Sequence, residues 1–160
     1  MSSDTPSPLA RALGRMPQGL HVVATGSPEE PLGFVASLVQ QVGFEPPTVC
    51  VAIAKGRDHV DAVRTGGGFT VSILDPESVG LMGAFFKKRD DGSTPFDELE
   101  TRPAPSGLPV LAGALAWLDC RLTGDHPTGD HVVVFGVAEA GSLLREGDPS
   151  VHLRSNGLDY

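Results

Sequence analysis

Cysteine is scarce in this 160-residue sequence, which holds only Cys50 and Cys120. Two cysteines cannot form a disulfide framework or a multi-cysteine metal site. The five histidines show neither HxH nor HExxH spacing, so we also expect no metal. Long apolar runs are missing: none approaches the roughly 18 residues of a membrane span, and the start of the chain lacks the apolar core of a secretory signal. We therefore expect a soluble, cytoplasmic protein without a membrane partner.

Basic residues are few: the sequence has 12 Lys and Arg but 20 Asp and Glu, which gives a net charge of -8. Such a balance does not favour phosphate backbones, so we expect no nucleic-acid partner. Three familiar motifs are also missing: the GxGxxG fingerprint of a Rossmann fold, the P-loop and the GxSxG nucleophile elbow. A redox enzyme with this sequence would have to bind a nicotinamide without a Rossmann domain.

Apolar residues make up 40% of the chain, which is enough for one hydrophobic core. The 20 glycines and 14 prolines lie outside any low-complexity tract, so they predict many short elements separated by turns. Residues 1–8 are rich in Ser and Pro and predict a flexible arm. Residues 9–160 are expected to form a single domain.

Six apolar runs predict β-strands, at residues 20–25, 32–42, 48–54, 69–74, 115–122 and 131–140. Helices are predicted at 9–16, 57–65 and 75–88, and a polar, proline-rich surface loop at 90–107. The run 49–54 is apolar throughout, which is typical of a strand covered on both faces. Polar and apolar residues alternate over 117–122, so one face there should be wet. Six strands with short helices predict a mainly β fold, an antiparallel barrel that is closed or half closed.

A first candidate site is the strand of small residues at 33–41. Small side chains let a flat ligand approach the backbone, whose free groups could bond the polar edge of a ring. An ordinary edge strand before a turn would show the same pattern.

A second candidate is the junction of strand and helix at Ala54, Lys55, Gly56 and Arg57. Unpaired amides at a helix N-terminus and two basic side chains suit a phosphate monoester. A solvated basic pair, with Asp58 capping the helix, is the alternative.

A third candidate is formed by His131, which follows a Gly-Asp turn, and by His152, Arg154 and Tyr160 near the end of the sequence. These side chains together can orient an electron-rich ring or a second anionic ligand. Taken singly, each histidine also fits a surface position or the edge of the core.

Taken in order, these segments resemble the flavin reductase-like, FMN-binding split-barrel family. The resemblance covers residues 13–160 and is carried by GFVAS at 33–37, FEPPTVCVAIAKGR at 44–57, GGFTVSIL at 67–74, LDC at 118–120 and GDH at 129–131. More narrowly, AIAKGRD and VHLRSNGLDY are similar to the flavin reductase module of cyanobacterial flavodiiron proteins. A diiron module with an HxHxD motif does not accompany it, so we expect the reductase module to stand alone.

The resemblance implies a Greek-key split barrel that forms a homodimer with flavin near the interface. It implies FMN or FAD as cofactor, NAD(P)H as donor of a hydride to flavin N5, and a redox partner protein or oxygen as acceptor. A flavin-binding electron relay without catalytic activity is the alternative. His131 is the catalytic residue that the resemblance implies. The implied flavin-binding residues are Val35, Ala36, Ser37, Leu38, Gln40, Gln41, Ala54, Lys55, Gly56, Arg57, His152, Arg154 and Tyr160.

The sequence departs from the family at Val35, Leu38 and Gln41, where the family often has Thr or Ser. Hydroxyls that commonly touch the ribityl chain or the phosphate are therefore missing. The amides of Gln40 and Gln41 could replace some of these contacts, because an amide both donates and accepts hydrogen bonds.

Overall fold

The structure is a computed structural model that describes residues 5–160. Its elements, in chain order, are α1 (Pro8–Leu13), β1 (Gln18–Gly19), β2 (His21–Gly26), β3 (Pro31–Ala36), β4 (Val39–Phe44), β5 (Pro47–Ala54), α2 (His59–Gly66), β6 (Gly68–Ile73), η1 (Val79–Phe86), η2 (Pro95–Glu98), β7 (Thr101–Pro103), β8 (Pro109–Leu111), β9 (Ala116–Thr128), β10 (His131–Leu143) and β11 (Val151–His152). The helices η1 and η2 are 3-10 helices. Within residues 5–160, no helix has the length and apolar character needed to cross a membrane.

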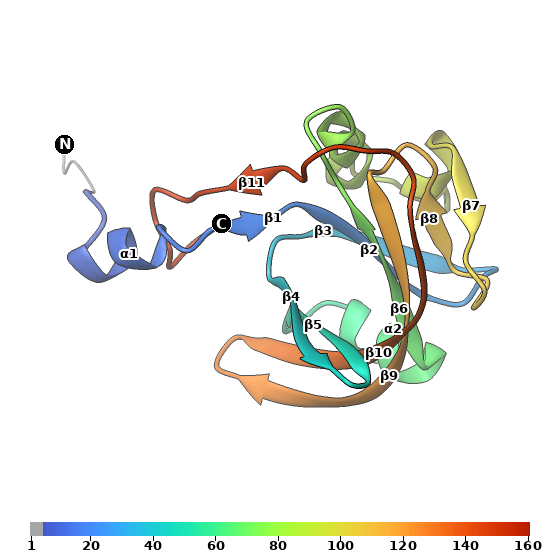
Figure 1. The fold of residues 1–160 in the computed structure, drawn as a ribbon, viewed down its shortest axis with the longest axis horizontal. Helices are drawn as coiled ribbons and strands as arrows, with labels where there is room; N and C mark the ends of the chain where they lie inside the picture. Colours follow the sequence, from blue (N-terminus) through green and yellow to red (C-terminus); the bar gives the residue numbers. More distant parts are fainter. Residues whose placement is uncertain (1–4) are drawn as a thin grey trace.

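Seven strands form one antiparallel sheet in the order β3-β2-β6-β9-β10-β5-β4. The sheet curls on itself (Figure 1), yet its two outermost strands, β3 and β4, do not pair with each other. The expected mainly β fold with short helices is confirmed. The alternative of a closed barrel is wrong for the described strands, because the opening between β3 and β4 leaves the barrel split.

The concave side of the sheet holds the main core, but strand β5 is not buried on both faces as its apolar sequence predicted. Val49, Val51 and Ile53 are buried in the core, whereas Ala52 and Ala54 on the other face are half-buried. Ala52 and Ala54 are apolar although they are not in the core, and both line a cavity on this other face.

The predicted strand at 32–42 is in fact two strands. β3 ends at Ala36 and β4 begins at Val39, and the chain bends at Ser37 and Leu38. The Leu38 carbonyl accepts a hydrogen bond from the Ala52 amide at 2.9 Å, so the bend stays attached to β5. This bend separates residues that a continuous strand would keep in one row.

Asp119 lies on the predicted wet face of the strand at 117–122, yet only 6% of its surface is exposed. The loop before β8 covers it, and its carboxylate accepts a hydrogen bond from the Ser106 amide at 2.8 Å. The expected loop at 90–107 is also more regular than predicted, since it contains η2 and β7, which pairs with β8.

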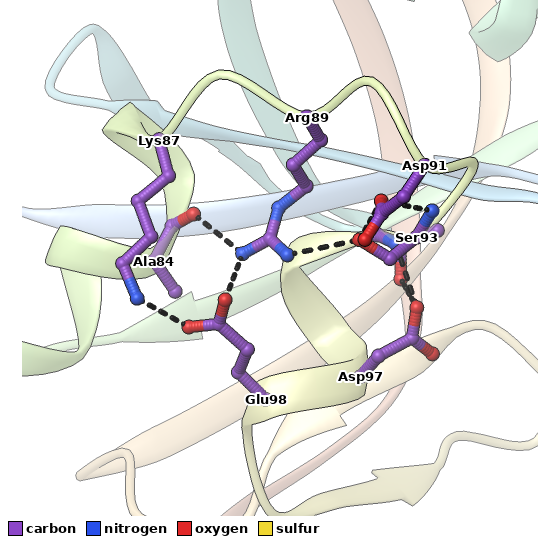
Figure 2. A network of polar contacts seen from close by, with 8 residues as sticks. Ala84, Lys87, Arg89, Asp91, Ser93, Asp97 and Glu98 are labelled. Atoms are coloured by element: carbon purple, nitrogen blue, oxygen red, sulfur yellow. Dashed lines mark hydrogen bonds and ion pairs between the residues drawn. The ribbon is translucent and has the colours of Figure 1, made fainter.

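The predicted helix at 75–88 is shorter than expected, and the segment after η1 is held by charged side chains (Figure 2). Lys87 Nζ and Arg89 Nη2 each donate to the Glu98 carboxylate at 2.7 Å, and Arg89 also donates to the Ala84 carbonyl at 3.2 Å. The bonds from Lys87 and Arg89 hold the pKa of Glu98 below its usual range. The network fixes η1 above the curled sheet.

At the other side of the molecule, α1 and the β1–β11 pair project from the curled sheet (Figure 1). Of the expected arm at 1–8, residues 1–4 lie outside the described part of the chain, and the Ser7 hydroxyl accepts a hydrogen bond from the Ala10 amide in α1. A Cβ on Gly14 would lie 2.2 Å from the Arg154 carbonyl oxygen, so glycine is required for this close approach. The C-terminal segment is thereby packed against α1.

Candidate functional site

A cavity of about 460 Å³ lies on the outer face of β5, between β3, η1 and the C-terminal segment. Its wall contains Leu20, Phe34, Val35, Ala36, Ser37, Leu38, Ala52, Ile53, Ala54, Arg57, His59, Met82, Phe86, His152, Arg154 and Tyr160. The volume is within the range of roughly 300–1,000 Å³ that is typical of small-molecule sites. Nine of the residues expected to bind flavin line this one cavity: Val35, Ala36, Ser37, Leu38, Ala54, Arg57, His152, Arg154 and Tyr160.

Small side chains line part of the cavity. Ala52 and Ala54 come from β5, Ala36 is the last residue of β3, and Ser37 follows it in the bend. These side chains leave room for a planar ligand to lie close to the backbone. Met82 and Phe86 of η1 line the cavity from another element and give it an apolar, polarisable boundary.

Only one of the two basic side chains in the junction after β5 lines the cavity. Arg57 lines it, whereas Lys55 Nζ donates to the Gly129 carbonyl at 2.8 Å and joins the junction to the β9–β10 turn. Gly56 has φ +80°, a conformation that glycine adopts without strain. Asp58 stands at the N-cap of α2 but its side chain makes no capping bond.

The C-terminal wall is closed by contacts between protein groups. Tyr160 Oη lies 2.5 Å from His131 Nε2, and His131 Nδ1 lies 2.7 Å from the Asp130 carboxylate. Arg154 sits over the Tyr160 ring at 4.9 Å and donates to the Ser37 hydroxyl at 2.5 Å. The structure thus brings His131 to the cavity as the neighbour of Tyr160, while the cavity wall itself does not include His131.

Gln40 and Gln41 lie elsewhere, at a second cavity of about 300 Å³ that is also lined by His21. Gln40 Nε2 donates to the Gln41 carbonyl at 3.3 Å, and Gln41 Nε2 donates to the Gly43 carbonyl at 3.1 Å. The bend at Ser37 and Leu38 separates both amides from the main cavity.

His59 is a cavity residue that the sequence reasoning did not select. It is the first residue of α2, and its ring packs on Phe34 with centroids 4.6 Å apart. Burial and then the charge of Arg57 lower its pKa, while the Gly33 carbonyl and Asp58 act in the opposite direction. Its position two residues after Arg57 was the only sequence signal that could have indicated it.

The two cysteines do not supply a nucleophile or a metal ligand set. Burial raises the pKa of Cys120 to about 12, and burial also raises that of Cys50. Both thiols therefore stay protonated near neutral pH. Among residues 5–160, no group of three or more His, Cys, Asp or Glu side chains is placed to hold a metal ion.

Comparison with known families points to a single domain type. The model of the flavin reductase like domain matches residues 13–157. The putative diflavin flavoprotein A 3 of Synechocystis sp. is 36% identical over 151 residues, which are 94% of this chain and 25% of that protein. The chain thus spans about a quarter of the length of this relative.

Two further proteins resemble this chain over most of their own length. The reductase subunit HsaB of a flavin-dependent monooxygenase from Mycobacterium tuberculosis is 30% identical over 135 residues, covering 84% of this chain and 71% of HsaB. The NADH:FAD oxidoreductase SgcE6 of Streptomyces globisporus C-1027 superposes with a TM-score of 0.82 at 26% identity, covering 91% of this chain and 86% of that one. A second structure of SgcE6 is a complex with NAD and FAD fragments.

Proposed function

This chain belongs to the flavin reductase like family, and we propose that it is an oxidoreductase that reduces FMN with NAD(P)H in the cavity beside β5. A flavin held in the cavity would supply an N5 atom that can accept a hydride from a nicotinamide and, once reduced, two electrons for an acceptor. The observation that carries the proposal is the cavity, which is lined by small alanine side chains together with Arg57, Arg154 and Tyr160.

The charge of the cavity fits a phosphorylated ligand. No Asp or Glu side chain among the described residues lines it, and its two permanently charged side chains are Arg57 and Arg154. This is a local excess of positive charge in a chain whose net charge is -8. Guanidinium groups bind phosphate through paired hydrogen bonds, so an anionic flavin is favoured over riboflavin.

Each wall then has a distinct part in binding. The backbone of Val35 to Leu38 bonds the polar edge of the ring, Arg57 binds the phosphate, and Arg154 and Tyr160 cover the ring from the C-terminal side. We propose that His131, through its bond to Tyr160, keeps that ring in place for the nicotinamide. FMN is favoured over FAD because its monoester phosphate matches one arginine at the α2 end of the cavity.

We also propose a homodimer. Strand β4 is an edge of the sheet and exposes Val42 and Phe44, the latter by 88%. An exposed edge with large apolar side chains is a typical interface between copies, and a stable one buries more than about 2,000 Å². Analytical ultracentrifugation tests this: a 16.7 kDa monomer at micromolar concentration contradicts it.

The acceptor that we propose is a partner protein or oxygen, since HsaB is by name the reductase subunit of a monooxygenase. The test of function is anaerobic mixing of the purified chain with FMN and then with NADH or NADPH. Binding should give flavin bands near ~370 and ~450 nm, and the latter should bleach on reduction. Bound flavin that neither nicotinamide reduces would favour the electron relay, and a chain that binds no flavin would overturn both.

A further inference from the structure

Three aromatic side chains other than histidine line the main cavity, and two of them already use a ring face inside the protein. Phe34 packs on His59, with ring centroids 4.6 Å apart. The Arg154 guanidinium lies over the ring of Tyr160, 4.9 Å from its centre. Phe86 makes no aromatic or cation contact in the described part of the chain, and 71% of its surface is exposed. Its ring is therefore available to a ligand.

The exposed position of Phe86 follows from the way η1 packs. The preceding residue, Phe85, is turned to the protein interior, where it packs edge-on to Phe96 with ring centroids 5.4 Å apart. A 3-10 helix has three residues per turn, so consecutive side chains point about 120° apart. Packing of Phe85 on the core thus turns Phe86 away from it and leaves Phe86 at the cavity.

The end of η1 that carries Phe86 is held by ion pairs (Figure 2). Lys87 and Arg89 both donate to the Glu98 carboxylate. Arg89 also donates to the Ala84 carbonyl, which is inside η1. A 3-10 helix of eight residues is long for its type, and its hydrogen bonds have poor geometry. The contacts with Glu98 therefore stabilise a helix end that would otherwise be weak.

Hydride transfer requires the nicotinamide and flavin rings to lie face to face, with the reacting atoms roughly 3–3.5 Å apart. A flavin that lies on the small side chains of Ala52 and Ala54 has its other face open to a nicotinamide. Met82 and Phe86 line the cavity from a different element, η1. The second face of the nicotinamide can then rest on η1.

The charge of the nicotinamide ring favours an aromatic neighbour. The hydride carries both electrons of the broken C4–H bond to flavin N5, so the nicotinamide ring changes from neutral to cationic. The face of a phenyl ring attracts a cation through its quadrupole. A phenyl ring in contact with the nicotinamide should therefore bind the oxidised form more tightly than the reduced form.

We propose that Phe86 stacks on the nicotinamide ring of NAD(P)H, on the face away from the flavin, and that the ion pairs of Glu98 with Lys87 and Arg89 hold Phe86 in place. This inference rests on the proposed function, which it deepens by naming a residue that recognises the nicotinamide. Phe86 is a substrate-binding residue. Glu98 is a positioning residue, because it acts through η1.

The test is isothermal titration calorimetry of the FMN-loaded chain with NAD⁺ and with ADP-ribose, or with their 2′-phosphates if NADPH is the better donor. ADP-ribose lacks the nicotinamide ring, and neither ligand reduces flavin, so binding is measured without the reaction. Phe86→Ala should raise the Kd of NAD⁺ about tenfold, as loss of a stacked and cation-binding ring allows. The Kd values of ADP-ribose and FMN should not change.

Two further substitutions separate stacking from simple filling of space. Phe86→Tyr keeps an aromatic face and should bind NAD⁺ as wild type does. Phe86→Leu keeps an apolar side chain without that face and should lose most of the tenfold. Leu143→Ala is the control, because it removes another exposed apolar side chain, on β10 outside the cavity. In stopped-flow reduction by NADH or NADPH, Phe86→Ala should raise the half-saturating concentration by less than it raises the Kd of NAD⁺.

Glu98→Gln removes the charge that holds Lys87 and Arg89, so it should raise the Kd of NAD⁺ by about threefold, the loss of roughly one modest hydrogen bond. Lys88→Gln is the matched control, because Lys88 is exposed and forms no ion pair among the described residues. In a Phe86→Ala background, Glu98→Gln should have no further effect on NAD⁺. Additive losses would overturn the positioning role. Melting temperatures check the fold of each variant.

Equal losses of NAD⁺ and ADP-ribose in Phe86→Ala would overturn the inference, since the ring would then contact the adenine or support the fold. An unchanged Kd for NAD⁺, a loss of FMN binding instead, or a wild type that reduces FMN without measurable affinity for NAD⁺ would overturn it too. Each of these outcomes leaves the proposed function standing as long as the wild type reduces FMN. A chain that binds neither flavin nor nicotinamide would overturn both.

Discussion

Arg145 and Arg154 lie on the same C-terminal segment, and their surroundings differ. Arg145 donates to both oxygens of Asp75, at 2.6 and 2.9 Å, and the Asp75 side chain is only 6% exposed. Arg154 instead meets a hydroxyl, that of Ser37, and the face of the Tyr160 ring. One arginine is tied to a buried charge, and the other is held by neutral groups at the cavity.

We call the ion pair of Arg145 and Asp75 the anchor, and the part of the cavity lining formed by Arg154 and Tyr160 the movable wall, because the two differ in how easily their contacts can be exchanged. A buried ion pair that loses one partner leaves an uncompensated charge, so the segment at Arg145 cannot leave without a large cost. A neutral hydroxyl and a ring can be exchanged for ligand groups at little cost, because a guanidinium bonds a carbonyl about as well as a hydroxyl, and bonds a phosphate more strongly. The same segment is therefore fixed at its start and able to rearrange at the cavity.

Breaking the anchor should have the largest effect on stability. Asp75→Asn removes the charge that pairs with Arg145 and weakens the turn in which Asp75 accepts from the Ser78 amide and hydroxyl. We expect the melting temperature to fall by about 10 °C, measured by calorimetry. Glu77→Gln is the matched control, because Glu77 is 3.8 Å from Arg145 with an 82% exposed side chain, and should change little.

The anchor also predicts a pH dependence. The hydrogen bonds from Arg145 and then Ser78 hold the pKa of Asp75 well below its usual range. A depressed carboxyl pKa stabilises the fold above the unfolded value of about 4, and this stability is lost as the pH falls below it. Wild type should lose melting temperature below pH 4 more steeply than Asp75→Asn. Parallel curves would show that Asp75 is not the group that matters.

The next largest effect is expected at Arg57, the other arginine that lines the cavity. Arg57→Ala should weaken FMN binding by roughly ten- to a hundredfold, the loss expected for a charge-assisted hydrogen bond, and riboflavin binding much less. Lys55→Ala should cost less, because its ammonium group is bonded to the Gly129 carbonyl. Quenching of flavin fluorescence measures both ligands. Equal losses for FMN and riboflavin would mean that Arg57 supports the fold and not the phosphate.

The strands could be predicted where apolar, β-branched residues continue without a break, as in β5 and β10. The break at Ser37 and Leu38 could not, because a single serine between apolar residues is common within a strand and the segment contains no Pro or Gly at that point. The pairing of β1 with β11 was missed for another reason: each strand has two residues, which is too few for any periodicity.

The candidate site was predicted in part for the same physical reasons. Small residues on a strand and a basic turn after a buried strand led to Ser37 and Arg57, which do line one cavity. Gln40 and Gln41 were grouped with them because one continuous strand was expected, and the bend carries both to a second cavity. A lone histidine forms no sequence pattern, so His59 became visible only as one of the residues that line the main cavity.

A smaller effect should follow from loosening the movable wall. His131→Ala removes the partner of the Tyr160 hydroxyl, so we expect flavin reduction to slow by about tenfold at saturating nicotinamide, as loss of one hydrogen bond allows. Stopped-flow absorbance gives the rate, and His131→Gln should restore most of it. A variant that loses melting temperature but keeps its rate would place His131 in the turn before β10 only.

The smallest effect on the melting temperature should come from breaking the ion pair of Arg64 and Asp125. This pair has two hydrogen bonds, as the pair of Arg145 and Asp75 has, but it is exposed to solvent. Arg64 donates twice to Asp125, at 2.9 Å each, and the two side chains are 48% and 23% exposed. Arg64 lowers the pKa of Asp125, yet exposed pairs add little to stability because water competes for both charges. Arg64→Ala should shift the melting temperature by no more than about 2 °C, and 1 M salt should remove most of that difference. A loss as large as that of Asp75→Asn would mean that paired geometry, and not burial, makes the contact between Asp75 and Arg145 an anchor.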